Sequence, residues 1–231
     1  MGGEITIQGG DGEFMGYLAT PATPGRASVV IIQEIFGVNK IMRDIADGLA
    51  ADGYVALCPD LFWRQEPGIQ LTDQSEAEWA RAFELFQGFD VPKGVTDIDA
   101  TIAHLRAMPD GSAKVGAVGY CLGGLLAYLT AARTSVDCAI GYYGVGIEGM
   151  LNEAGDIKGQ LMLHIAEEDQ FVPPDAQVQV CEGLADNSHV AIHSYPGADH
   201  AFARIGGEHH DQAAADLANG RSRDFFRANL G

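Results

Sequence analysis

The sequence predicts an α/β fold in which a mostly parallel central sheet carries helices on both faces. Predicted strands alternate with predicted helices along the 231 residues, which is the pattern of βαβ units. Residues 28–33 (SVVIIQ) form a nearly continuous apolar, β-branched run, as expected of a central strand buried on both faces. Residues 114–128 add a short apolar run, a glycine-rich turn and an apolar segment with helical spacing. This length and 47% hydrophobic residues suit a single domain over residues 1–231.

The other elements follow from hydrophobic periodicity and from turn residues. Two short strands flank a glycine-rich turn near the N-terminus. The helix over 41–52 has Ile41, Ile45 and Leu49 on one face and is followed by Gly53, a residue that suits a helix C-terminus. In chain order, we expect strands at 4–8, 16–19, 28–33 and 54–58, helices at 41–52, 76–89 and 95–108, the strand, turn and helix of 114–128, strands at 136–143, 160–166 and 189–195, and helices at 174–185 and 213–230.

The turn around Cys121 has the form Gly-x-Cys-x-Gly, with Gly119 and Gly123 on either side. At a strand-to-helix turn of this kind the central residue takes strained backbone angles, and the glycines remove Cβ atoms that would clash. Cys121 would then project from the carboxyl edge of the sheet, where the dipole of the next helix stabilises a thiolate. With serine at its centre, this turn is the nucleophile elbow of α/β-hydrolases. The motif alone is equally compatible with a buried structural cysteine.

Two further candidate catalytic residues, Asp169 and His200, each follow a later predicted strand. Because parallel strands end at the same edge of a sheet, we expect both side chains near Cys121. The order nucleophile, acid, histidine is that of α/β-hydrolases. We predict that His200 takes the proton of Cys121 and that Asp169 orients the ring. Alone, Asp169 could be a turn residue and His200 a structural one, and Glu167 and Glu168 are less favoured candidates for the acid.

Composition excludes several other functions. The net charge of −18 argues against nucleic acid and anionic membranes as partners. Because the sequence shows neither a signal peptide nor an apolar run of membrane-spanning length, and because its four cysteines are widely spread, we expect a cytoplasmic protein. No phosphate-binding loop or dinucleotide fingerprint occurs, and the run 208–211 (EHHD) lacks further ligands at zinc spacing. We therefore expect no cofactor and no metal. We also expect a monomer that acts on a small molecule.

The sequence resembles the dienelactone hydrolase (carboxymethylenebutenolidase) family. Matching segments occur in order over nearly the whole chain. They are residues 33–39 (QEIFGVN), 58–61 (CPDL), 119–124 (GYCLGG), 141–144 (GYYG), 169–173 (DQFVP) and 200–204 (HAFAR). The resemblance implies an α/β-hydrolase fold. It also implies hydrolysis of a lactone or ester, in the first place a dienelactone, through an acyl-thioester on Cys121.

The resemblance also implies roles for residues outside the triad. Glu34 corresponds to the family's glutamate beside the catalytic cysteine. The backbone N–H groups of Ile35 and Leu122 correspond to an oxyanion hole. Arg204 corresponds to an arginine that binds a substrate carboxylate, which is plausible chemistry in a chain with so few cations.

The sequence departs from the family pattern on the helix over 76–89. The family has a second carboxylate-binding arginine where this sequence has Trp79, and a pocket tyrosine where it has Phe83. Arg81 is only two residues from Trp79 and so lies on another helix face, which favours a solvent-exposed charge. We expect Trp79 to contact substrate and to make that side of the pocket more apolar.

Phe36 and Tyr142 are also predicted to line the substrate pocket, although both are equally compatible with the core. Trp79 leaves open a broader carboxylesterase or thioesterase that acts on less acidic substrates. A function of another class, a redox sensor that uses Cys121 without hydrolysis, also remains open but does not require the full set of candidate residues.

Overall fold

The computed structural model describes residues 2–23, 27–108 and 113–231. The chain divides into two compact units, Met1–Ala117 and Val118–Gly231. The expectation of one domain over residues 1–231 stays a prediction. None of the helices in the described ranges combines the length and the apolar character that crossing a membrane requires.

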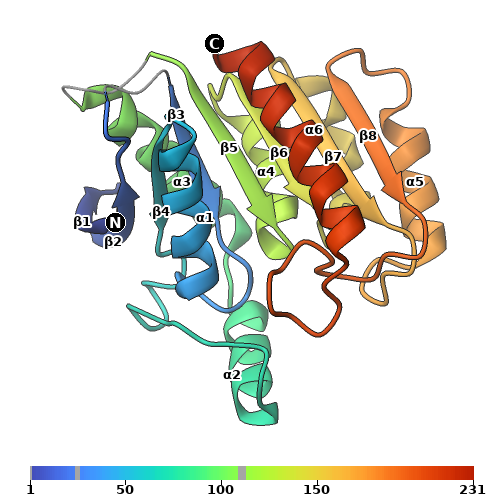
Figure 1. The fold of residues 1–231 in the computed structure, drawn as a ribbon, viewed down its shortest axis with the longest axis horizontal. Coiled ribbons are helices and arrows are strands. Elements are labelled where there is room, and N and C mark those ends of the chain that lie inside the picture. The colour runs from blue at the N-terminus through green and yellow to red at the C-terminus, as the bar shows by residue number, and fades with distance from the viewer. Residues whose placement is uncertain (1, 24–26, 109–112) are drawn as a thin grey trace. The chain divides into compact units, whose positions relative to one another are not determined.

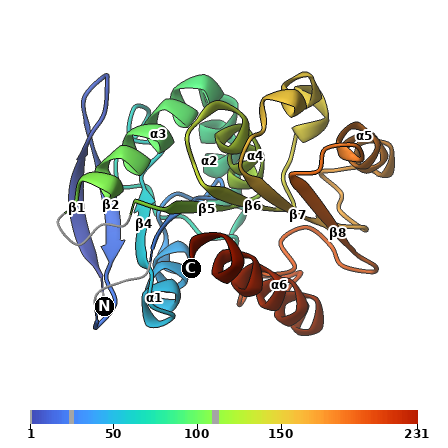
Figure 2. The same ribbon diagram turned by 90° about the horizontal axis from the view of Figure 1, so that it is seen from above.

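The described part of the first unit holds strands in the order β1-β2-β4-β3. Its elements are β1 (Gly3–Gln8), β2 (Glu13–Ala19), β3 (Ser28–Ile32), α1 (Lys40–Ala51), β4 (Val55–Pro59), α2 (Glu76–Gln87) and α3 (Val91–Ala107). β2 is antiparallel to β1 and to β4, whereas β3 and β4 are parallel. Every residue of β3 and β4 is buried, and Figure 2 shows α1 on one face of these strands and α3 on the other. The predicted central strand is therefore covered on both sides.

Capping residues set the starts of these helices. The side chain of Asn39 accepts a hydrogen bond from the Met42 amide at the start of α1. The side-chain oxygen of Ser75 accepts from a backbone amide of α2 in the same way. The helix expected at 95–108 begins at Val91, because Asp90 caps it and a proline occupies its first turn. Periodicity alone therefore placed this start four residues too late.

The second unit holds strands in the order β5-β6-β7-β8. The elements are β5 (Val115–Tyr120), which runs across the division between the units, α4 (Leu122–Arg133), β6 (Cys138–Tyr142), the 3₁₀ segment η1 (Ile147–Asp156), β7 (Gln160–Ala166), α5 (Pro174–Leu184), β8 (Val190–Tyr195) and α6 (Gln212–Leu230). β6, β7 and β8 are parallel, with Tyr142 opposite His164 and Ala166 opposite Tyr195. Figure 1 shows α6 along β6 and β7, and Figure 2 shows α4 and α5 on the opposite face. The loops after these three strands therefore begin at one edge.

Candidate active site

Cys121 occupies a strained turn between β5 and α4, as the Gly-x-Cys-x-Gly pattern predicts. Its φ is 56° and its ψ is −115°, outside the range that non-glycine residues usually adopt. A Cβ atom on Gly119 would lie 1.9 Å from the carbonyl oxygen of Gly123, so only glycine fits there. The Cys121 amide donates to the carbonyl oxygen of Tyr142 at 3.1 Å. The turn thus holds the cysteine at the start of a helix and against the end of β6.

Asp169 and His200 meet in the loops that follow β7 and β8. His200 Nδ1 lies 2.8 Å from Asp169 Oδ2, and both side chains are almost fully buried. The other carboxylate oxygen of Asp169 accepts from the amides of Phe171 at 2.8 Å and Val172 at 3.3 Å. Both neighbouring acidic residues, at 167 and 168, are exposed. Asp169 is therefore the carboxylate that can orient the imidazole.

The electrostatics of His200 connect it to Cys121. Burial by itself acts to lower the pKa of His200. The negative charge of Cys121 and hydrogen bonds to Asp169 and Cys121 outweigh burial and raise that pKa from 6.5 to about 10. The ring is then protonated at neutral pH and is hydrogen-bonded to Cys121. An imidazolium of this kind can deliver a proton to a leaving oxygen.

Two aromatic side chains that the sequence analysis did not assign pack against the His200 ring. Tyr143 meets it edge-on with ring centres 5.1 Å apart, and Phe171 does so at 4.8 Å. Phe171 is 36% exposed, which makes it an apolar surface next to the imidazole. In the described part of the chain, the non-glycine residues with positive φ are Cys121, Tyr143 and Ala201, and each is a site residue or its direct neighbour. Strain of this kind gathers at functional sites.

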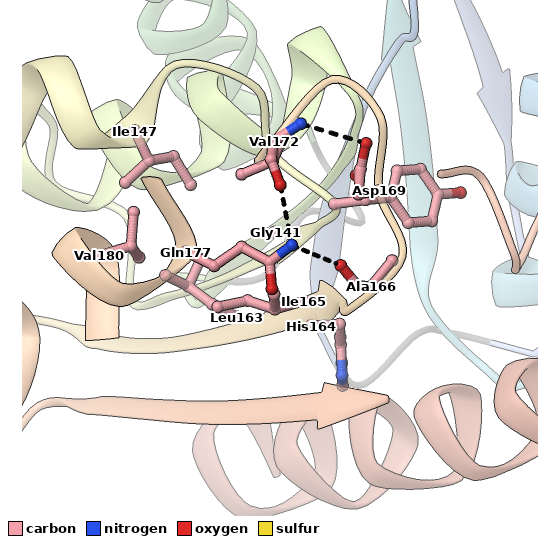
Figure 3. Close-up of a pocket in the computed structure, with 12 residues that line it drawn as sticks. Gly141, Ile147, Leu163, His164, Ile165, Ala166, Asp169, Val172, Gln177 and Val180 are labelled. Carbon is pink, nitrogen blue, oxygen red and sulfur yellow. Dashed lines mark hydrogen bonds between the residues drawn. The ribbon is translucent and has the colours of Figure 1, made fainter. Parts of the chain in front are cut away.

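Gln177, on α5, holds the loop that carries Asp169. Its side-chain nitrogen donates to the carbonyl oxygens of Ala166 at 3.1 Å and Val172 at 2.8 Å, on either side of the acid (Figure 3). Beneath this loop lies a cavity of about 20 Å³, which has room for about one water molecule and is too small for a lactone. Gln177 was missed because its partners are backbone atoms that no side-chain pattern reveals.

In the first unit, Glu34 and Ile35 directly follow β3, and both are buried. The side chain of Gln33 braces this segment. Its Nε2 donates to the carbonyl oxygen of Glu34 at 3.2 Å, and its Oε1 accepts from the Leu61 amide at 2.9 Å. The segment that carries the expected glutamate and oxyanion-hole amide is thus held to the loop after β4.

An aromatic cluster in the first unit contains Trp79, at the position where the family resemblance predicts an arginine. Trp79 packs edge-on against Phe36 with ring centres 5.0 Å apart and stacks on Phe83 at 5.5 Å. The indole N–H donates to the carbonyl oxygen of Asp73 at 3.0 Å, which fixes its orientation. Arg81 forms salt bridges with surface carboxylates, in agreement with its interpretation as a surface charge.

The remaining candidate residues of the second unit are buried. Leu122 is the first residue of α4, and Arg204 lies four residues after the imidazole, with 6% of its surface exposed. Tyr142 is 1% exposed, and its hydroxyl contacts Ser222 and Asn219 of α6. Tyr142 is therefore part of the core, as is Phe36, which is also 1% exposed. Contact of either ring with substrate stays a prediction.

Comparison with known proteins supports the fold. The model of the "Dienelactone hydrolase family" matches residues 14–230. The chain is 49% identical to a "Putative carboxymethylenebutenolidase" of Azospirillum brasilense over 99% of both chains. It is 44% identical to the carboxymethylenebutenolidase of Pseudomonas putida, over 96% of this chain and 94% of that protein. A crystal structure titled "Putative Dienelactone Hydrolase" from Klebsiella pneumoniae superposes with a TM-score of 0.87 at 26% identity, over 98% of each chain. These likenesses confirm the predicted α/β-hydrolase fold.

Proposed function

The chain belongs to the dienelactone hydrolase family and is a carboxylic ester hydrolase, and we propose that it opens a dienelactone by covalent catalysis at Cys121. The observation that carries this proposal is the buried Asp169–His200 pair, whose imidazole is hydrogen-bonded to Cys121 and has a raised pKa. A protonated ring beside a sulfur anion supplies both the nucleophile and the acid that ester cleavage needs.

In the first half of the proposed reaction, the thiolate attacks the lactone carbonyl carbon. A C–S bond forms, and the carbonyl π electrons move to the oxygen. The oxyanion then collapses, the ring C–O bond breaks, and the leaving oxygen takes the proton of His200 Nε2. An acyl-thioester on Cys121 and a neutral imidazole remain. Asp169 holds the ring and supports its positive charge.

In the second half, neutral His200 takes a proton from water as the water oxygen attacks the thioester. The second oxyanion collapses, the C–S bond breaks, and sulfur leaves as the thiolate beside the imidazolium. The Leu122 amide is a suitable oxyanion donor because the first N–H groups of a helix lack intrahelical acceptors. We propose the Ile35 amide as the second donor and Glu34 as a carboxylate that restrains the thiol, both on the basis of the family resemblance.

Substrate selection is proposed to rest on Arg204 and on the aromatic cluster of Phe36, Trp79 and Phe83. Arg204 would bind a substrate carboxylate, because a guanidinium pairs with it through two hydrogen bonds. The cluster favours less acidic, more apolar substituents than a second arginine would. The alternative is therefore a broader carboxylesterase or thioesterase. We also propose a cytoplasmic monomer, without nucleic acid or membrane partners, which the four free cysteines and the net charge of −18 favour.

The test is a substrate panel assayed on wild type, Cys121→Ala and Arg204→Ala. The panel holds a carboxylate-bearing dienelactone, its neutral methyl ester and simple aryl esters and thioesters. We expect Cys121→Ala to lose turnover, and a mass adduct on Cys121 when wild type is quenched during turnover. Arg204→Ala should lose rate on the carboxylate-bearing lactone and little on the methyl ester. Cys181→Ala, a partly exposed cysteine on α5, is the matched control.

Three outcomes separate the candidates. Turnover by Cys121→Ala at the wild-type rate would exclude the covalent mechanism. Faster hydrolysis of neutral esters and thioesters than of the acidic lactone would favour the broader esterase. Reversible peroxide oxidation of Cys121 with no hydrolysis anywhere in the panel would favour the redox sensor.

A further inference from the structure

A row of hydrogen-bonded polar side chains, most of them buried, runs through the second unit, and the proposed reaction does not use it. The row links three neighbouring strands to α6. Its members are Tyr142 on β6, His164 on β7, Tyr195 on β8, and Asn219, Arg221 and Ser222 on α6. The two tyrosines and His164 are each at most 3% exposed. In Figure 3 the His164 side chain points away from the other residues that line the small cavity.

The number of hydrogens that each group can donate sets the direction of the hydrogen bonds around Tyr142 and Ser222. Tyr142 donates its single hydroxyl hydrogen to Asn219 Oδ1 at 3.0 Å. The 2.6 Å contact between Tyr142 and Ser222 must then be donated by Ser222. Because Ser222 donates its only hydroxyl hydrogen to Tyr142, it can only accept from His164. The ring of His164 therefore donates its Nε2 hydrogen to Ser222 Oγ at 3.0 Å. His164 therefore carries a hydrogen on Nε2.

The rest of the row follows from the charge of His164. Burial, with smaller contributions from His193 and Arg221, lowers the pKa of His164 from 6.5 to about 3. The ring is neutral, so Nδ1 has no hydrogen and accepts the hydroxyl of Tyr195 at 2.7 Å. Tyr195 in turn accepts from Arg221 at 3.1 Å. All five hydrogen bonds then point one way, from Arg221 to Asn219.

One member of the row, Tyr142, also supports Cys121 through its backbone. The carbonyl oxygen of Tyr142 accepts the amide of Cys121 at 3.1 Å. A Cβ atom on Gly124 would lie 2.6 Å from that same oxygen, so the start of α4 packs closely against this strand end. The next residue, Tyr143, donates its amide to the carbonyl oxygen of His164 at 2.8 Å and lays its ring against His200. Tyr142 and Tyr143 thus touch both reacting partners.

We propose that this one-way relay positions the sulfur of Cys121 against the ring of His200, with Tyr142, Ser222 and His164 as positioning residues. The relay holds the side chain of Tyr142 in place. The carbonyl oxygen of Tyr142, which accepts the Cys121 amide, then fixes the position of Cys121. Since each hydroxyl both accepts and donates, removing one leaves a buried neighbour without a partner. The inference rests on the proposed Cys121–His200 pair.

The test compares Tyr142→Phe and Ser222→Ala with Tyr128→Phe. Tyr128 is a matched control in the same unit, since it is fully buried and its hydroxyl donates to the Met150 carbonyl at 3.0 Å, away from the relay. We expect kcat on the dienelactone to fall about 10- to 100-fold in the two relay variants, with KM changed less than about twofold, because small misplacement of a nucleophile is costly. Tyr128→Phe should stay within about twofold of wild type in both constants.

A second readout separates positioning from a general loss of stability. In the relay variants, the pKa of His200, followed by NMR of its ring, should fall from about 10 toward 6.5 because the sulfur charge is less well placed. Relay variants whose kcat and His200 titration match those of Tyr128→Phe would overturn the inference. A raised KM at unchanged kcat would also overturn it and make Tyr142 a substrate contact instead.

Nitrogen-15 NMR of the wild-type histidines tests the direction of the relay without any variant. We expect His164 to be the Nε2–H tautomer at neutral pH, with Nδ1 unprotonated, and Nδ1–H would overturn the relay. Failure of the proposed function has a different signature, because it would appear as full turnover by Cys121→Ala. A Cys121→Ala variant without activity, together with relay variants that behave like the control, would refute the relay alone.

Discussion

Replacing Cys121 by serine tests the charge placed on the sulfur. Among the influences that raise the pKa of His200, the charge of Cys121 is the largest, ahead of the hydrogen bond to Asp169. Serine keeps the position and nearly the size of the side chain, but its hydroxyl is uncharged across the accessible pH range. The variant therefore removes one charge and leaves Asp169 in place.

The expected change in the pKa of His200 follows from its present value and from the effect of burial. Burial alone would take its pKa below 6.5, yet the pKa lies at about 10. An opposite charge in contact moves a pKa by about one to three units. We expect the His200 ring of Cys121→Ser to titrate about one to three pH units lower than in wild type. That difference corresponds to about 1–4 kcal/mol of mutual stabilisation between thiolate and imidazolium.

The assay is an NMR titration of the His200 ring, with Cys181→Ser as the control that removes a distant thiol. The pH dependence of wild-type activity is a second measurement, and its direction follows from the pKa of His200. Below pH about 10 the ring carries the proton that the leaving oxygen needs, and above it the ring has none, so the acylation rate should fall as pH rises through that value. If His200 titrates at the same pH in Cys121→Ser and wild type, the ion pair does not exist and the mechanism fails.

Three further predictions concern the supports of the site. Gln177→Leu removes the hydrogen bonds that hold the Asp169 loop. We expect the free energy of unfolding to fall by about 1–3 kcal/mol and kcat/KM to fall about tenfold. Gln170→Leu, at an exposed position, should change neither quantity. Gly119→Ala forces a Cβ atom to 1.9 Å from a backbone oxygen and should cost more than about 4 kcal/mol in urea unfolding, whereas Gly149→Ala, which has open space, should be nearly neutral. Trp79→Arg should raise the ratio of the hydrolysis rate of the carboxylate-bearing lactone to that of its methyl ester about tenfold or more, and Trp79→Phe should not. The same ratio in both variants would show that Trp79 does not select the substrate.

The sequence predicted what local signals encode. The order of strands and helices, the strained turn at Cys121 and the positions of Asp169 and His200 all follow from strand ends and turn residues, which neighbouring residues largely determine. The start of α3 was placed late because capping by Asp90 outweighs periodicity there. The 3₁₀ segment η1 was not predicted because such short turns have little periodicity of their own.

The supports of the site could not be predicted, because they depend on register and on backbone acceptors. Gln177 bonds to carbonyl oxygens up to eleven positions earlier in the chain, and Gln33 bonds across a gap of 28 residues. Phe171 lies in a segment that carries the family resemblance, yet only the folded loop shows that its exposed ring meets His200. Spacing in the sequence does not distinguish such residues from ordinary surface or core positions.

Register also explains why the relay of Tyr142, His164 and Tyr195 lies where it does. β6, β7 and β8 are parallel, and Tyr142 pairs directly with His164 in the ladder, while Tyr195 closes β8 two residues further on, opposite Ala166. Side chains on one face of neighbouring strands lie within reach of each other. A register slip of one residue would turn His164 to the opposite face and break two bonds of the relay at once. The strand ladder therefore also positions the Tyr142 carbonyl that accepts the Cys121 amide. Substitutions that disturb the packing of β7 are expected to shift Cys121 even though they do not contact it.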